Sequence, residues 1–332
     1  MGKVNVREHN RVVTSLLPPV ETEEEYRPVC RRPDVWLPAM RVICQRHGLD
    51  AARLELAPPG THVVFGVGER YIKLFAPPWR EDALPERLSL AKLSGRPDLP
   101  VPQLVAEGEI EGWPYVVLTT VAGVPLSQVW DEIEPPGLVR IAARCGELMG
   151  ALHATPVDGL EPLAVDWPAF IEEQTRDCAA YYARSGLSER WKRSITAFLD
   201  DLPPLFEPGF RPVLLNADIT DEHILVRRRG GQWQVTGLID FGDARLGHPC
   251  YDFVAVGCSV TWGSPDALRA MLLAYGYPET RLDATLSRRL MAYTLLHDFI
   301  RIPDLLDWFD FERPASFREL ARALWSFSDE GI

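Results

Sequence analysis

The sequence predicts an α+β fold with a small N-terminal lobe built on an antiparallel sheet and a larger, mainly helical C-terminal lobe. Short apolar runs separated by glycine and proline turns gather before residue 120, and such runs are typical of strands. After residue 127 the apolar residues recur mostly at helical spacing. A chain of 332 residues that is 46% hydrophobic can bury a core of this size.

These changes of pattern divide the chain into four predicted segments. Residues 1–33 are proline-rich and charged and form an N-terminal extension, and residues 34–120 form the N-terminal lobe. Residues 121–126 are a linker, and residues 127–332 form the C-terminal lobe.

The amino-acid composition limits which binding partners and which cellular compartment are expected. The formal net charge of −12 disfavours a general attraction to nucleic acid or to anionic lipid and favours a cationic small molecule. No apolar run approaches the roughly 20 residues of a membrane span, and the first ten residues lack the apolar core of a signal peptide. Six cysteines without a C-x-x-C pair indicate a reduced, cytoplasmic setting, although a disulfide remains an alternative.

In the N-terminal lobe we expect a helix over 34–47 that ends at Gly48, then strands over 54–57, 62–66 and 71–75. Strands over 101–104 and 113–120 complete the predicted sheet. Lys73 lies centrally in an apolar strand, where an ammonium group needs a partner. Glu86, on a helix predicted over 84–93, is the best candidate and Glu81 is its rival. The alternative is a lysine whose charged end reaches solvent at a sheet edge.

The C-terminal lobe is predicted to begin with a strong helix over 138–153, whose His153 we interpret as structural. Further helices are expected over 164–202 and 266–325. Between them, runs at 212–215, 223–226 and 234–239 are apolar and β-branched, with a charged turn at 227–231.

Two carboxylates in this central stretch, Asp218 and Asp240, each directly follow a predicted strand. Phosphoryl transfer needs one carboxylate to accept the proton of the attacking hydroxyl and another to hold the metal that neutralises the phosphates. The alternative is that both are ordinary turn residues, a frequent role for aspartate.

The residues around these two aspartates resemble the sequence motifs of a known protein family. NADITDEH at 216–223 and IDFGDA at 239–244 resemble the motifs H-G-D-x-x-x-x-N and I-D-F/W of the aminoglycoside phosphotransferases, which have a protein-kinase-like fold. The order of the other segments looks most like the hygromycin B 7″-O-kinase branch. Asn216 stands in place of the family's histidine and His223 in place of its metal-binding asparagine. Asp252 resembles the family's helix-starting aspartate, and we interpret it as a structural residue at an N-cap.

The resemblance implies a bilobal protein-kinase-like fold that transfers the γ-phosphate of ATP or GTP, with Mg²⁺ or Mn²⁺, to a hydroxyl of a small molecule. Asp218 would be the catalytic base, Asp240 a metal ligand and His223 a second one. The alternative is that His223 only caps the turn after Asp221 and that Asp240 alone holds the metal. Residues 121–126 would be the hinge. The nucleotide would be held by an ion pair between Lys73 and Glu86 and by main-chain groups of Gly60, Thr61, Thr119 and Val121.

The expected acceptor is a cationic, aminoglycoside-like antibiotic. Acidic residues concentrate near the C-terminus, and the family places C-terminal helices along its acceptor pocket; the alternative is a solvated acidic face. Two other functions remain open: a kinase of another metabolite or of a nucleoside antibiotic, and a nucleotide-binding pseudokinase. We expect a monomer or a dimer. The acidic residues in question are Asp298, Asp304, Asp307, Asp310 and Glu312.

Overall fold

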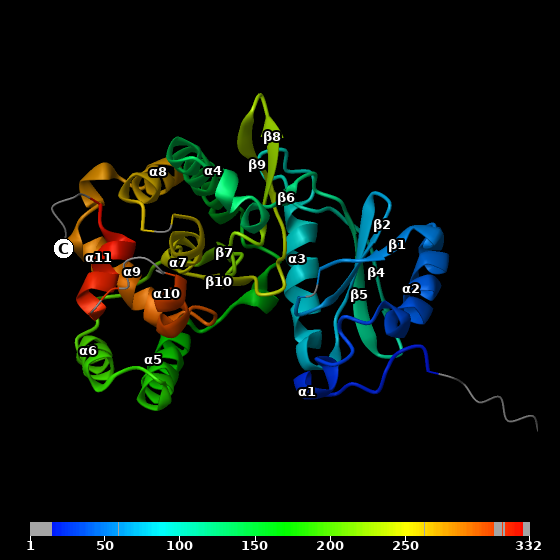
Figure 1. Ribbon diagram of the computed structural model, residues 1–332, viewed down its shortest axis with the longest axis horizontal. Helices are drawn as coiled ribbons and strands as arrows, with labels where there is room; N and C mark the ends of the chain where they lie inside the picture. The colour runs from blue at the N-terminus through cyan, green and yellow to red at the C-terminus, as the bar shows by residue number, and fades with distance from the viewer. Residues whose placement is uncertain (1–14, 59, 262, 309–313, 315, 328–332) are drawn as a thin grey trace, which may run out of the picture. The chain divides into compact units, whose positions relative to one another are not determined.

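The computed structural model describes residues 15–58, 60–261, 263–308, 314 and 316–327 (Figure 1). The chain separates into two compact units. The first comprises residues up to 83 together with 104–120, and the second comprises residues 84–103 together with those from 121 onward.

The first unit is built on a five-stranded antiparallel sheet of order β1-β2-β3-β5-β4. Helix α2 (Pro33–His47) ends at Gly48, whose φ of 65° is the left-handed conformation that glycine favours. The side chains of Trp36, Met40 and Ile43 are buried in one core with alternate residues of β2. The strands are β1 (Leu54–Leu56), β2 (Val63–Val67), β3 (Arg70–Leu74), β4 (Leu104–Ile110) and β5 (Trp113–Thr119).

Two parts of this unit differ from the expectation. The strand expected at 101–104 begins only at Leu104 and runs to Ile110 as the edge strand β4, whose exposed positions include the apolar Val105 as well as Glu107 and Glu109. A short helix, α1 (Glu23–Tyr26), forms where no element was expected and is capped reciprocally by Thr22 and Glu25. Tyr26 is buried against Trp36, so this part of the extension belongs to the core.

The second unit is mainly helical. Helix α4 packs against α8 so closely that a Cβ at Gly146 would collide with the main chain of Met271. This approach requires glycine on α4. The helices are α3 (Ala83–Leu93), α4 (Pro135–His153), α5 (Trp167–Arg184), α6 (Glu189–Leu199), α7 (Cys250–Val256), α8 (Pro265–Tyr275), α9 (Ala284–Leu296), α10 (Ile302–Trp308) and α11 (Phe317–Trp325).

Two small sheets lie among these helices. Strand β7 (Val213–Leu215) pairs with β10 (Arg245–Gly247), and β8 (Ile224–Arg229) forms a hairpin with β9 (Gln232–Leu238). The predicted runs therefore form strands, close to their expected positions. Strand β6 (Val124–Pro125), within the expected linker, adds to the edge of β8.

All six cysteines are free thiols, and five of them are buried. Among the described residues, no helix is both long enough and apolar enough to cross a membrane.

Candidate active site

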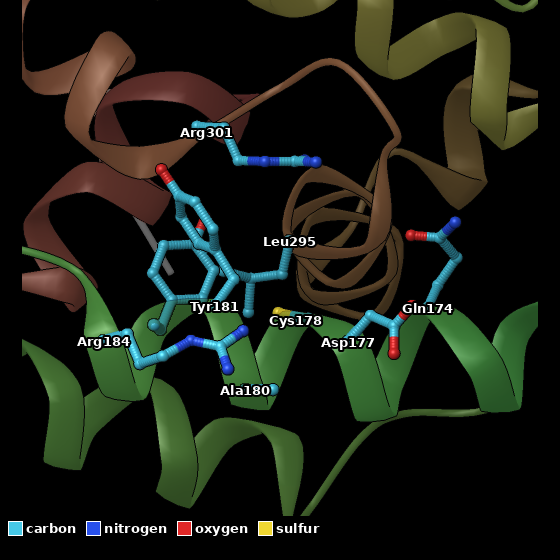
Figure 2. A pocket seen from close by; sticks show the side chains of 9 residues that line it. Gln174, Asp177, Cys178, Ala180, Tyr181, Arg184, Leu295 and Arg301 are labelled. Carbon is cyan, nitrogen blue, oxygen red and sulfur yellow. The ribbon is translucent and has the colours of Figure 1, made fainter.

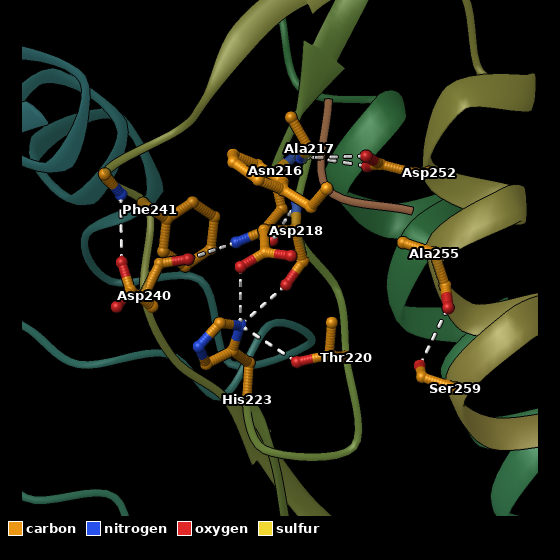
Figure 3. A network of polar contacts seen from close by, with 12 residues as sticks. Asn216, Ala217, Asp218, Thr220, His223, Asp240, Phe241, Asp252, Ala255 and Ser259 are labelled. Carbon is orange, nitrogen blue, oxygen red and sulfur yellow. Dashed lines mark hydrogen bonds and ion pairs between the residues drawn. The ribbon is translucent and has the colours of Figure 1, made fainter. Parts of the chain in front are cut away.

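Strand pairing brings the two aspartate motifs together in the second unit. In the β7–β10 pair Arg245 lies opposite Leu215, which sets the loop before β10 beside the loop after β7. The main-chain N–H of Ile239 also donates to the carbonyl of His223 at 3.0 Å. Figure 3 shows the resulting arrangement, with Asp218 and Asp240 on neighbouring loops.

Asn216 ties the two loops to each other. Its side-chain Nδ2 donates to the main-chain carbonyl of Asp240 at 2.5 Å, and its Oδ1 accepts from the N–H of Asp218 at 3.1 Å. The residue is fully buried. An asparagine can act in both directions because its amide carries a donor and an acceptor. One buried side chain therefore joins the two aspartate loops.

Asp252 anchors the start of the same loop. Its carboxylate accepts from the N–H groups of Asn216 at 3.1 Å and Ala217 at 2.8 Å, and its Oδ2 lies 3.0 Å from Nε2 of His153. The prediction that it is an N-cap was wrong, because α7 begins at Cys250 and Asp252 lies in its first turn. Its side chain bonds instead to a loop distant in sequence. His153 is structural, as expected.

The carboxyl group of Asp218 is unusually basic. Burial is the main reason that its pKa is raised to about 7; the nearby charges of Asp243 and Asp240 act in the same direction, and the charge of His223 acts against them. A carboxylate with such a pKa is well suited to accept a proton near neutral pH. A perturbed acid of this kind is also a common sign of a functional site.

His223 is bonded to the same residue. Its Nδ1 lies 2.6 Å from the main-chain carbonyl of Asp218, 3.3 Å from Oγ1 of Thr220 and 3.4 Å from Oδ2 of Asp218. Because a carbonyl only accepts, Nδ1 must carry the hydrogen. A neutral ring then has its lone pair on Nε2, the atom that would bind a metal.

Asp240 has a backbone that suits a specialised role. Its φ of 63° is rare for a residue other than glycine, and its Oδ1 accepts from the N–H of Gly242 at 3.1 Å. Such strained conformations are frequent at functional sites.

The chemistry of this site fits a hard divalent cation. Asp218, Asp240 and Asp243 place negative charge close enough to raise the pKa of Asp218, and a cation would relieve that repulsion. Within the described part of the chain no three His, Cys, Asp or Glu side chains are grouped to hold a metal. Mg²⁺ does not need such a cage, since it commonly uses one or two carboxylates, water and substrate phosphates.

The residues expected to hold nucleotide fall in both units. Lys73, 5% exposed on β3, lies over the ring of Phe75 in the first unit, which also contains Gly60, Thr61 and Thr119. Glu86 and Val121 belong to the second unit. Glu86 is 1% exposed, and its Oε2 accepts from the N–H of Phe241 at 3.1 Å, beside the metal-binding candidate. The ion pair between Lys73 and Glu86 stays a prediction.

The acidic residues near the C-terminus differ in their surroundings. Asp298 pairs with Arg245 at 2.8 Å and accepts from Gln174 at 2.5 Å, so its charge is largely compensated. Asp304 and Asp307 are exposed on α10. Asp310 and Glu312 lie outside the described residues. Sequence reasoning missed Arg245, although an arginine five residues after Asp240 in a buried strand was a signal that an acid must lie nearby.

Known proteins resemble this chain in sequence and in fold. The family described as "Phosphotransferase enzyme family" matches residues 61–284. Viomycin phosphotransferase of Streptomyces vinaceus is 26% identical over 217 residues, 60% of this chain and 70% of that protein. An uncharacterised Bacillus subtilis protein, YcbJ, is 28% identical over 185 residues, 52% of this chain and only 57% of its own length.

Solved structures with this fold include two antibiotic phosphotransferases. The GDP complex of aminoglycoside 2′-phosphotransferase-IIIa has a TM-score of 0.65 at 22% identity, covering 78% of this chain and 88% of that one. A macrolide 2′-phosphotransferase from Brachybacterium faecium has a TM-score of 0.56 at 19% identity, covering 77% and 90%. These likenesses confirm the predicted kinase-like α+β fold. With a family match that spans well over half of its length, the chain belongs to the phosphotransferase enzyme family and is a phosphotransferase.

Proposed function

We propose that this enzyme transfers the γ-phosphoryl group of ATP, with GTP as the alternative donor, to a hydroxyl of an aminoglycoside-like antibiotic. The observation that carries the proposal is the pairing of two aspartate loops by Asn216. It places Asp218, whose pKa is raised to about 7, beside Asp240. Two carboxylates with different tasks are what phosphoryl transfer to an alcohol requires.

In the proposed reaction Asp218 orients the acceptor hydroxyl and takes its proton. The hydroxyl oxygen forms the new bond to the γ-phosphorus, and the bond from that phosphorus to the β–γ bridging oxygen breaks, which releases the nucleoside diphosphate. Asp240, and His223 through Nε2, would hold Mg²⁺, with Mn²⁺ as the alternative. The metal would neutralise charge on the phosphates.

Nucleotide binding would draw on the remaining predicted residues. Lys73 would meet the phosphates and pair with Glu86, and the amides of Gly60 and Thr61 would cover them. Main-chain groups of Thr119 and Val121 would bind the adenine edge. The bond from Phe241 to Glu86 supports this assignment on one side, because it ties the carboxylate of Glu86 to the residue that follows Asp240.

Three observations support a cationic antibiotic as acceptor. The net charge is −12, Asp304 and Asp307 are exposed, and named relatives act on antibiotics. Hygromycin B is the first acceptor to test, because the order of segments resembles that branch. Viomycin is the second, since a phosphotransferase for it is a relative.

One observation favours a second candidate, a kinase of a neutral metabolite or nucleoside. Asp298, expected to attract a cation, is already paired with Arg245. An acceptor pocket with fewer uncompensated acids would select less strongly for a polycation. For either acceptor class we expect the enzyme to act in the cytoplasm.

The test is a phosphorylation screen with purified full-length enzyme and Mg²⁺. ATP and GTP are each offered with hygromycin B, viomycin, a panel of aminoglycosides and a panel of neutral nucleosides and sugars. Product mass is read for one added phosphate, and Asp218→Asn is the matched control. Phosphorylation of a cationic antibiotic that is lost in Asp218→Asn supports the proposal. Phosphorylation of neutral acceptors alone would establish the second candidate. Slow nucleotide hydrolysis that no acceptor stimulates would indicate a pseudokinase.

A further inference from the structure

A cavity of about 400 Å³ lies in the second unit between α5, the end of α9 and the segment that joins α9 to α10 (Figure 2). Its size falls within the range of small-molecule sites. Tyr181 and Leu295 give it apolar walls, and Gln174, Asp177, Arg184 and Arg301 give it polar ones. It lacks the acidic lining expected for a polycationic ligand.

The charge of the cavity is opposite to that of the whole protein. Two arginines, Arg184 and Arg301, line it against one acid, Asp177, although the chain carries a net charge of −12. Burial raises the pKa of the neighbouring Cys178 thiol to about 12, so that group adds no negative charge.

Arg301 is held in place without using an acid. Its Nη1 donates to the main-chain carbonyls of His297 at 2.7 Å and Ile300 at 3.0 Å, and its guanidinium lies 5.2 Å from the ring centroid of Tyr181. The acid that lines the cavity, Asp177, pairs with Arg176 at 3.3 Å. The nearby Asp298 is bonded to Arg245 and Gln174 instead.

We propose that this cavity binds a small organic anion, a carboxylate attached to a flat apolar group. A carboxylate would accept charge-assisted hydrogen bonds from the guanidinium groups, which match its planar geometry. The flat group would pack against Tyr181 and Leu295. A polycationic acceptor would be repelled by the two arginines, so this ligand is distinct from the proposed acceptor and does not depend on its identity.

The test measures binding of 4-fluorobenzoate to the full chain by fluorine NMR. Saturating ADP and Mg²⁺ are present so that the nucleotide site stays filled. Neutral 4-fluorobenzamide and cationic 4-fluorobenzylamine are the matched ligands. We expect both to bind about tenfold or more weakly than the benzoate, the effect of losing one charge-assisted hydrogen bond.

Substitutions of residues that line the cavity test whether 4-fluorobenzoate binds there. Arg184→Gln and Arg301→Gln should each weaken 4-fluorobenzoate about tenfold. Asp177→Asn should strengthen the binding of 4-fluorobenzoate by a small factor, roughly two- to fivefold. This substitution removes a partly solvated negative charge that repels the negatively charged ligand. Such a gain cannot arise from a damaged fold. Arg190→Gln, an exposed arginine on α6, should leave binding unchanged.

Either of two results overturns the proposal. One is equal binding of the benzoate and the benzamide, which would show that charge is not recognised. The other is benzoate affinity that stays the same in Arg184→Gln, Arg301→Gln and Asp177→Asn, which would place the anion elsewhere.

Discussion

The side-chain amide of Asn216 donates to the main-chain carbonyl of Asp240, 24 residues further along the chain, at 2.5 Å. The same side chain accepts from the N–H of Asp218. One buried amide thus fixes the distance between the proposed base and the proposed metal ligand. Catalysis is sensitive to such positioning, because small displacements of reacting groups slow a reaction severely.

Replacing Asn216 should damage both stability and turnover. Asn216→Ala leaves the carbonyl of Asp240 and the N–H of Asp218 without this partner, which costs about 1–3 kcal/mol for a buried polar group. We expect the loss of stability to exceed the loss of transition-state stabilisation. Denaturant unfolding and kcat/KM measure the two effects. Asn216→His, which introduces the family's residue, should recover part of both, and equal behaviour of the Ala and His variants would show that the side-chain bonds are unimportant.

Asp252 should matter through the loop that it anchors. Asp252→Asn keeps the shape of the side chain but turns one of its oxygens into an N–H donor facing other donors. Because the carboxylate is fully buried and accepts from two main-chain N–H groups, we expect a loss of about 2–4 kcal/mol. Urea unfolding measures it. Asp266→Asn, at an exposed first-turn aspartate of α8, is the matched control and should change stability little.

The carboxyl group of Asp218 should be required for activity but should lower the stability of the folded protein at neutral pH. Asp218→Asn should lower kcat by about 10² to 10⁴, the usual contribution of a general base. Because burial raises the pKa of Asp218 to about 7 from 3.8, folding favours its protonated form. The folded state therefore loses stability as pH rises from about 4 to 7, and the loss is constant above that range.

The asparagine variant lacks this penalty, so its midpoint of thermal unfolding should exceed that of the wild type at pH 8. The difference should shrink as pH falls toward 4. Thermal unfolding without nucleotide or metal across this pH range provides the measurement. A variant that is less stable than the wild type at pH 8 would show that the ionised carboxylate is well solvated.

Much of this site could be predicted from the sequence because its strands are short and apolar and end at the aspartates. Asp218 and Asp240 follow β7 and β9 as expected. The partners that hold them could not be found in the same way. Asp252 reads as a helix cap from its neighbours in sequence, whereas its hydrogen bonds run to residues 35 and 36 positions earlier.

An ion pair between residues far apart in the sequence also explains why the charge of Asp298 is compensated, contrary to the prediction. Its charge appeared available within an acidic run, but Arg245, which compensates it, lies in a strand 53 residues earlier (298 − 245). The edge strand β4 was placed too early for a different reason. Its Val105 is apolar but exposed, so apolar and polar residues do not alternate along β4 as they do in a typical half-buried strand.

Glu86 has two proposed roles that a conservative variant can separate. Glu86→Gln keeps an acceptor for the N–H of Phe241 but removes the charge that would pair with Lys73. If the ion pair matters, Glu86→Gln, Glu86→Ala and Lys73→Ala should all raise the KM for ATP, and the effects of Lys73→Ala and Glu86→Gln should not add in the double variant. Additive effects would show that Lys73 and Glu86 do not act as an ion pair. A larger effect of Glu81→Ala would assign the partner to Glu81.

His223 is where the chain departs from the metal-binding asparagine of its family, and the structure sharpens the test. Its Nδ1 donates to the carbonyl of Asp218, so only Nε2 can bind a metal. An imidazole nitrogen suits Mn²⁺ better than Mg²⁺, whereas an amide oxygen suits Mg²⁺.

If His223 is a ligand, His223→Asn should shift the ratio of kcat/KM values toward Mg²⁺, and His223→Ala should impair the reaction with both metals. If His223 only holds the loop through Nδ1, both variants should lose stability and keep the metal preference of the wild type. Steady-state kinetics with each metal, together with urea unfolding of the metal-free proteins, distinguishes the two roles. Thr220→Val, which removes the weaker contact to Nδ1 at 3.3 Å, is the control for loop packing and should not alter metal preference in either case.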